Sequence, residues 1–184
     1  NLSKVMNYFV IVLIFTFLVI TMYLHVFKYF IPNPKYWIGL KVVPILLAAN
    51  ICLGIYTSLS IWYKLSEKTI FGSLISITGV IITMVINFLF IPKYGYLASA
   101  YATLACYGSM MLLSYFLGQY FYPVKYKIWK FLIYFVSGGL IYYLSLDFKG
   151  NESFTIVEYA YQSLLISCYV VLVYLIERPK KLLI

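Results

Sequence analysis

Charged residues are scarce in this 184-residue chain, in which 10% of residues are Asp, Glu, Lys or Arg and 64% are hydrophobic. A soluble domain uses about 25% charged residues to cover its surface. The shortage therefore excludes a water-exposed globular fold and indicates a lipid bilayer around most of the chain. The net charge of +9 could suggest a nucleic-acid partner. Every Lys and Arg, however, lies outside the long apolar runs, as expected of residues that anchor helix ends in a membrane, so we expect no nucleic-acid partner.

Groups that carry catalysis or bind metals are also few. The chain has one histidine, His25, and its three cysteines all fall inside apolar runs, where they act as small fillers. No cluster of His, Cys or carboxylates has the spacing of a metal site, and no glycine-rich phosphate loop occurs. Asp147, Glu152 and Glu158 lie close in sequence, but such a group is more typical of a solvated loop than of an acid–base pair. We therefore expect no catalytic residues, no cofactor, no metal and no enzymatic activity.

Long apolar runs dominate what is present. A helix needs about 20 residues to cross a hydrocarbon core of about 30 Å. The runs are continuously apolar and do not alternate, which favours helices over strands. We predict an all-α integral membrane protein with a single transmembrane domain over 1–184. Its six helices are expected at about 5–27, 42–63, 69–91, 96–120, 131–146 and 155–176. The chain begins at Asn1 and its first helix lacks a signal-peptide cleavage pattern, so we expect the C-terminal segment of a longer protein.

The distribution of positive charge predicts the orientation. One side of the membrane receives Lys4, Lys64, Lys68, Lys125, Lys127, Lys130, Arg178, Lys180 and Lys181, and the other receives Lys28, Lys35, Lys41, Lys93 and Lys149. The side richer in Lys and Arg is expected in the cytoplasm. Both ends of this segment then face the cytoplasm, as six spans require. Aromatic residues gather at the ends of the runs, Trp62 and Tyr63 among them, and predict an interfacial belt.

Small residues predict which helices pack closely. In helix 69–91 they are Gly72, Ser76 and Gly79, and in helix 96–120 they are Ala98, Ala102 and Ala105. Each set lies on one face, and small faces let helix backbones approach in lipid. We predict a tight antiparallel hairpin in which Pro92 ends the first helix and Gly95 allows the reversal. Helix 5–27 has almost no small residues and is expected to face lipid. In helix 131–146, Ser137-Gly138-Gly139 predicts a close contact or a flexing point.

Uncharged polar residues inside the spans are candidates for lining a transport pathway. We single out Asn50, Thr57, Asn87, Tyr101 and Tyr107. The alternative is that such groups bond between helices or back to their own helix carbonyls. No charge lies in the central part of any span, so a site for a coupling ion is not expected within this segment.

One ordered set of motifs resembles a known family. It consists of Ile91-Pro92-Lys93-Tyr94-Gly95 followed by small residues up to Ala102-Thr103, with Val43-Pro44 to Asn50, Gly54 and Trp62-Tyr63-Lys64-Leu65 upstream. Over roughly 42–126 this set resembles the bacterial polysaccharide flippases, the O-antigen and exopolysaccharide transporters of the MATE-like (MOP) superfamily. Ala98 stands where that family often has glycine.

The resemblance implies part of a MATE-like two-lobe bundle in the bacterial inner membrane. Family members have two lobes around a central cavity and flip a lipid-linked oligosaccharide, a polyprenyl-pyrophosphate sugar, for O-antigen, lipopolysaccharide or other surface polysaccharide biosynthesis. The implied partners are that lipid and N-terminal helices of the same protein. The cationic cavity residues of the family have no counterpart in the spans of this chain. The alternatives are a MATE-like exporter of lipid II or a drug, and a non-transporting membrane subunit.

Overall fold

The structure is a computed structural model that describes residues 2–121, 128–147 and 156–177. Its elements are α1 (Leu2–Met22), α2 (Leu24–Lys28), the 3₁₀ helix η1 (Pro34–Val42), α3 (Val43–Leu59), α4 (Ile61–Leu65), α5 (Ile70–Tyr94), α6 (Tyr96–Phe121), α7 (Ile128–Asp147) and α8 (Ile156–Glu177). Within these ranges there is no strand, and six helical stretches are long and apolar enough to cross a membrane. The prediction of an all-α membrane protein with six spans is confirmed.

The first two spans are more broken than the sequence predicts. The helix expected at 5–27 ends at Met22 and resumes as α2 after Tyr23. The second span begins earlier, because η1 starts at Pro34, a position where the missing proline N–H is tolerated. Asn33 caps η1 by accepting a hydrogen bond from the Lys35 backbone N–H at 3.0 Å. A 3₁₀ helix therefore precedes the helix that was expected to begin at about residue 42.

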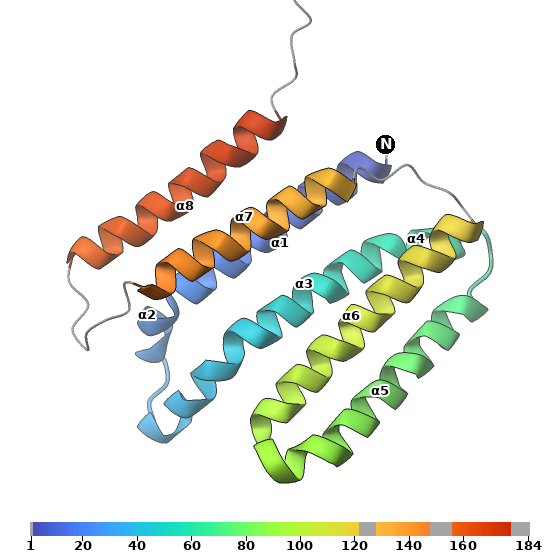
Figure 1. The fold of residues 1–184 in the computed structure, drawn as a ribbon, viewed down its shortest axis with the longest axis horizontal. Coiled ribbons are helices and arrows are strands. Elements are labelled where there is room, and N and C mark those ends of the chain that lie inside the picture. The colour runs from blue at the N-terminus through green and yellow to red at the C-terminus, as the bar shows by residue number, and fades with distance from the viewer. Residues whose placement is uncertain (1, 122–127, 148–155, 178–184) are drawn as a thin grey trace, which may run out of the picture.

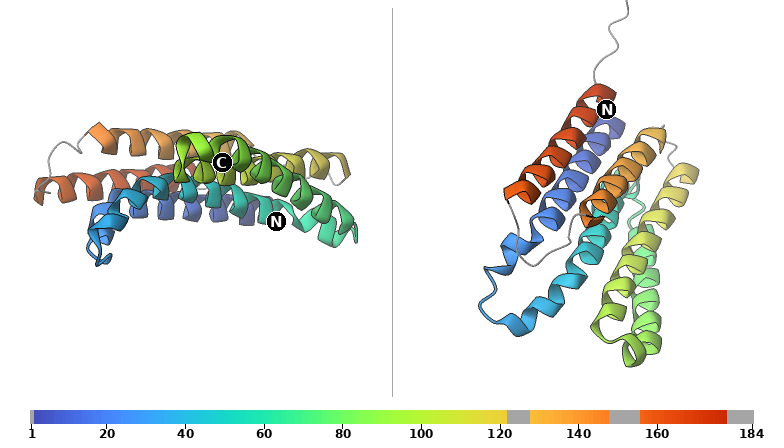
Figure 2. Two further views of the ribbon diagram at one scale, coloured as in Figure 1. Left: turned by 90° about the horizontal axis from the view of Figure 1, so that it is seen from below. Right: turned by 60° about the vertical axis from the view of Figure 1, so that its left-hand side comes forward.

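The helices lie side by side in a flat slab. Figure 1 shows the order α8, then α7 over α1, then α3, α6 and α5, so that α8 and α5 form opposite edges. The edge-on view in Figure 2 shows how thin this arrangement is. One end of the slab carries α4, the end of α6 and the start of α7, and we call it the α4 end. The other, which carries η1 and the α5–α6 turn, is the η1 end.

Helix α1 is a central element of the slab, contrary to the expectation that it faces lipid. Its buried apolar side chains recur at every fourth residue and are at most 6% exposed; they are Met6, Val10, Ile14, Leu18 and Met22. The glycines that allow close packing lie on the partners instead. A Cβ at Gly54 of α3 would lie 2.6 Å from Leu13, and one at Gly138 of α7 would lie 2.6 Å from Ile14. Large side chains of α1 thus fill notches in its neighbours.

Helix α6 is buried along a second stripe at every fourth residue, formed by Ala98, Ala102, Cys106, Met110, Ser114 and Gly118. The stripe packs against α5 and α3, which flank α6. A Cβ at Gly79 of α5 would lie 2.7 Å from the Met110 sulfur, so this glycine permits the close approach of α5. Ala105 is half-buried beside the stripe. The remaining small residues of α5 face elsewhere: Gly72 lies against the Tyr63 ring, and Ser76 is exposed.

The turn between α5 and α6 depends on Gly95 alone. The expectation that Pro92 ends the helix is wrong, because α5 continues through Pro92 to Tyr94. The proline φ angle suits a helix, and the loss of one N–H is tolerated in a membrane helix. Gly95 instead caps the helix at φ 59° and ψ −141°, and its N–H bonds to the Ile91 carbonyl at 2.8 Å. Only glycine adopts this conformation at low cost.

Trp62 and Tyr63 are not part of an interfacial belt, since they are 2% and 6% exposed. The Trp62 indole donates a hydrogen bond to the Ser114 carbonyl at 3.2 Å and stacks on Phe121 at 5.8 Å. Gly118 leaves room for this indole, because a Cβ there would lie 2.9 Å from it. Trp62 therefore connects α4 to α6, whereas Tyr63 lies against Gly72 of α5 and its hydroxyl is hydrogen-bonded to that of Tyr56 of α3 at 3.2 Å. By contrast, Trp129 remains 75% exposed, as a belt residue would.

Candidate functional site

The candidate pathway residues of α3 do not reach inward. Asn50 and Thr57 are both exposed on the surface of the helix. The Thr57 hydroxyl donates to the Gly54 carbonyl at 2.8 Å, one turn back on the same helix. This is the back-bonding that the sequence left open as the alternative.

The other three candidates lie apart from one another. Asn87 is half-buried in an open groove along α5, whereas the 57% exposed Tyr101 lines a groove of about 420 Å³ between α5 and α6. Tyr107 is half-buried and packs against a small core that includes Tyr56 and Ile75. Among the described residues, therefore, no cavity contains two of these three side chains.

Hydroxyl groups inside the spans mostly bond to their own helix. Thr78, Thr83, Thr103 and Ser109 each donate to a carbonyl three or four residues earlier, at 2.7 to 3.0 Å. Such bonds satisfy the hydroxyl without a partner on another helix. The described part of the middle of the slab therefore offers few polar groups to a solute, although the Oδ1 of Asn87 is buried without a hydrogen-bond partner.

The strongest polar constellation lies at the α4 end, between α7 and α8. Lys130 Nζ donates to Glu177 Oε1 at 2.7 Å, and the hydroxyl of Tyr134 donates to the same oxygen at 2.8 Å. The Lys130 and Glu177 side chains are 24% and 23% exposed, and Tyr134 is fully buried. We call these three residues the Glu177 network. It links the first turns of α7 to the last turn of α8 by charge and by a buried hydroxyl.

Further polar groups surround the Glu177 network. Tyr8 of α1 and Tyr169 of α8 are electrostatic neighbours of the Tyr134 hydroxyl. Tyr169 is 1% exposed, and its hydroxyl is buried without a hydrogen-bond partner. The Oδ1 atom of Asn7, near the start of α1, is in the same condition. Buried polar groups without partners cost free energy, but Gln162 near the start of α8 also has one, so these atoms do not single out the α4 end.

Sequence reasoning missed the Glu177 network because its partners are 47 positions apart. Glu177 falls one residue beyond the expected end of the last helix and beside Arg178, so it resembles an ordinary flanking charge. No signal in the sequence distinguishes it, because Glu177 ends α8 just as Asp147 ends α7. The register between α7 and α8, which pairs it with Lys130, is not encoded in either helix alone.

The remaining candidates can be placed only in part. His25 lies in α2 and Asp147 is the last residue of α7, whereas Glu152 lies outside the described residues. Glu158 stands in the first turn of α8 and is half-buried. Among the described residues, no group of three His, Cys, Asp or Glu could hold a metal ion. Cys52, Cys106 and Cys168 are free thiols on three different helices.

Comparisons with known proteins give no relative. No protein-family model matches the chain, and no curated protein or solved structure is significantly similar to it.

Proposed function

We propose that this chain is part of a MATE-like polysaccharide flippase of the bacterial inner membrane. It would contribute six helices of one lobe to the movement of a polyprenyl-pyrophosphate oligosaccharide from the cytoplasmic to the outer leaflet. The partners would be that lipid and helices of a second lobe of the same protein. Both ends of the segment would face the cytoplasm.

The observation that carries the proposal is the ordered motif set of 42–126. Its residues have definite positions in the structure: Gly95 makes the reversal, Ala98 and Ala102 are buried on α6, and Trp62 is held by Ser114. The motif set thus coincides with the tightly packed α3–α5–α6 unit. The flatness of the slab also supports the proposal, because a flat layer of helices can form one wall of a cavity between two lobes (Figure 2).

The Glu177 network suits a transporter that changes shape. A partly exposed ion pair between two neighbouring helices stabilises one arrangement by a modest amount, of about 1 kcal/mol or less. An interaction of this size can be broken and re-formed during a transport cycle. We propose that it steadies α8 against α7 while the cytoplasmic side is closed.

Deletion of the gene tests the proposal directly. A flippase mutant accumulates its lipid-linked oligosaccharide in the cytoplasmic leaflet and loses surface polysaccharide, and the intact gene on a plasmid restores both. The lipid is measured by its accessibility to a membrane-impermeant sugar oxidant in right-side-out and inverted vesicles. Normal surface polysaccharide in a deletion strain without a second flippase would refute the proposal.

The same strain separates the flippase from an exporter of another substrate. A drug exporter predicts greater sensitivity to cationic drugs with normal surface polysaccharide. A lipid II flippase predicts arrested cell-wall synthesis. The proposed function requires the polysaccharide defect without either of these changes.

A further inference from the structure

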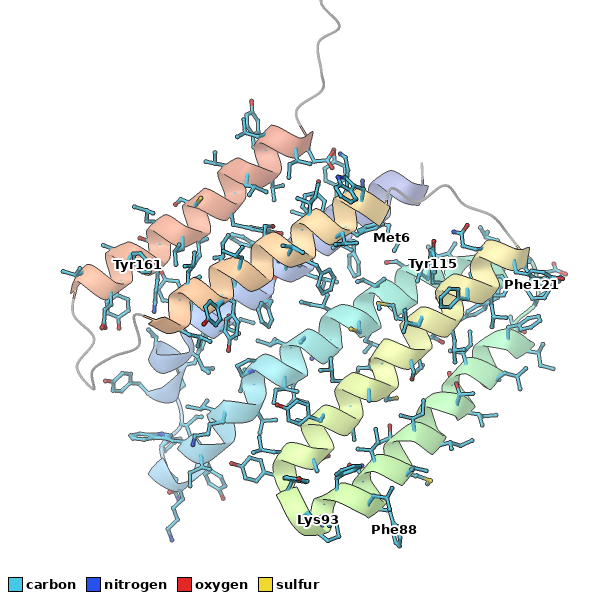
Figure 3. All side chains as sticks on the ribbon, viewed as in Figure 1. Met6, Phe88, Lys93, Tyr115, Phe121 and Tyr161 are labelled. Carbon is cyan, nitrogen blue, oxygen red and sulfur yellow. The ribbon has the colours of Figure 1, made fainter. Side chains whose placement is uncertain are left out.

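A cleft of about 290 Å³ lies at the α4 end where α1, α3, α6 and α7 meet. Its floor is formed by buried side chains, including Met6 and Leu59, which are 6% and 3% exposed. Its walls come from α6 and α7. Figure 3 shows Met6 and Tyr115 close to each other in the gap between these helices. All nine residues that line the cleft are apolar or aromatic.

The cleft opens sideways out of the slab. The wall residues Leu112 and Phe116 of α6 are 52% and 65% exposed, and Phe135 of α7 is 43% exposed. All three lie inside spans that cross the membrane. The assigned spans therefore place the mouth at the depth of the hydrocarbon core.

Water and empty space are both poor occupants. A buried water needs two to four polar partners, and this lining offers at most a tyrosine hydroxyl. An empty cleft would forfeit the dispersion contacts of its whole lining. The volume equals that of about ten water molecules at about 30 Å³ each. A space of this size suits part of a single acyl chain. It is too small for a helix, whose diameter with side chains is about 10–12 Å.

Positive charge near the cleft indicates which class of lipid would place an acyl chain in it. Lys64 of α4 is exposed five residues beyond the floor residue Leu59. Lys130 directly precedes the wall residue Phe131, but its charge is compensated by Glu177 at 2.7 Å. A lipid whose tail enters the cleft would have its headgroup at the α4 end, near the Lys64 ammonium group. An exposed lysine at this position favours an anionic headgroup.

We propose that this cleft binds one acyl chain of an anionic phospholipid from the leaflet at the α4 end. The lipid fills the junction of four helices and adds contacts between α6 and α7. The site does not depend on the flippase proposal, because it concerns a resident membrane lipid and not a transported substrate.

The test uses the full-length protein in nanodiscs that contain phosphatidylglycerol with a photoreactive diazirine in its acyl chain. After irradiation, mass spectrometry locates the crosslinks. We expect them to concentrate on the peptides that carry Leu112, Phe116, Phe131 and Phe135. Unlabelled phosphatidylglycerol should compete several-fold better than phosphatidylcholine.

Two variants of neighbouring leucines give the matched control. Leu112→Trp places a large ring in the mouth and should lower the crosslink yield several-fold. Leu113→Trp changes the next residue, which is outside the lining, and should leave the yield unchanged. Labelling of lipid-facing Leu74 of α5 as strong as that of the cleft would overturn the proposal. Equal competition by the two lipids, or no labelling because another helix covers the mouth, would also overturn it.

Discussion

Gly95 shows how much of a hairpin can depend on the backbone of one residue. Its φ of 59° with ψ of −141° lies where side chains are strained, yet a Cβ would meet no atom within 4 Å. Any cost of Gly95→Ala is therefore conformational and not steric. Such strain costs about 1–3 kcal/mol.

We expect Gly95→Ala to lower the thermal stability of the purified protein in detergent, measured as the loss of a monodisperse gel-filtration peak on heating. Gly108→Ala is the matched control, since it also has no atom within 4 Å and lies inside α6 with an ordinary helical φ. That variant should be neutral or slightly stabilising. Equal behaviour of the two variants would refute the role assigned to Gly95.

Ala102 tests the packing of α6. It is fully buried, and a leucine there adds methylenes to a closely packed site, which costs about 1–3 kcal/mol. We expect Ala102→Leu to lower membrane expression and stability. Ala160→Leu makes the same change at an exposed position of α8 and should have little effect. Unchanged expression and stability of Ala102→Leu would contradict the close contact of α6 with its neighbours.

At this scale the sequence was informative where a residue type has one dominant use. Glycine in a turn and alanine on a packing face were identified from their spacing alone. Pro92 and Trp62 were misjudged because each type has two uses in a membrane: proline breaks or merely bends a helix, and tryptophan sits at the interface or in the core. The neighbours decide between them, and Gly118 and Ser114, which accommodate Trp62, are more than 50 positions away.

Among the elements, α1 shows why one helix cannot be judged in isolation. Its lack of small residues suggested a lipid-facing surface, but the complementary glycines are on α3 and α7. The residue pattern of one helix does not show where its neighbours carry the glycines that accommodate its side chains. The number of spans depends on the length of each apolar run, which a single helix does show, and it was predicted correctly.

The central place of α1 can be tested with two substitutions. Ile14 is 3% exposed and lies against Gly138, so Ile14→Ala leaves a cavity and should cost about 2–5 kcal/mol. Val12 is 58% exposed on the same helix, and Val12→Ala should change stability little. Thermal unfolding in detergent, followed by the fluorescence of a thiol-reactive dye on the buried Cys106, compares them in a background in which Cys52 and the exposed Cys168 are changed to serine. Similar losses for both variants would count against α1 as a central helix.

The Glu177 network joins two elements, and a double-mutant cycle measures that link. Glu177→Gln and Lys130→Gln each remove one charge, and together they remove the pair. Because both side chains are partly exposed, we expect a coupling energy of about 0.2–1 kcal/mol, smaller in high salt. Tyr134→Phe should destabilise further, because it removes the hydroxyl that bonds to the same oxygen. A coupling of zero at low salt would show that the pair does not stabilise α8.

For the whole molecule, the flat arrangement is the feature that the sequence did not predict. Run lengths place helices in a membrane but do not say which neighbours they choose. The order α8, α7 with α1, α3, α6 and α5 arises from contacts between helices that are distant in sequence, such as α3 with α6. For the same reason, the sequence could not show which of the candidate pathway residues lie near one another, because that depends on the order of the helices.

The proposed orientation of the slab rests on the distribution of its lysines and can be measured on the whole chain. Lys64 at the α4 end and Lys93 at the η1 end are both exposed, so each can be replaced by cysteine in a background with the three native cysteines changed to serine. The side with more Lys and Arg is retained in the cytoplasm during insertion. A membrane-impermeant maleimide should therefore label Lys93→Cys in intact cells and Lys64→Cys only after the membrane is opened. The reverse pattern would invert the proposed topology.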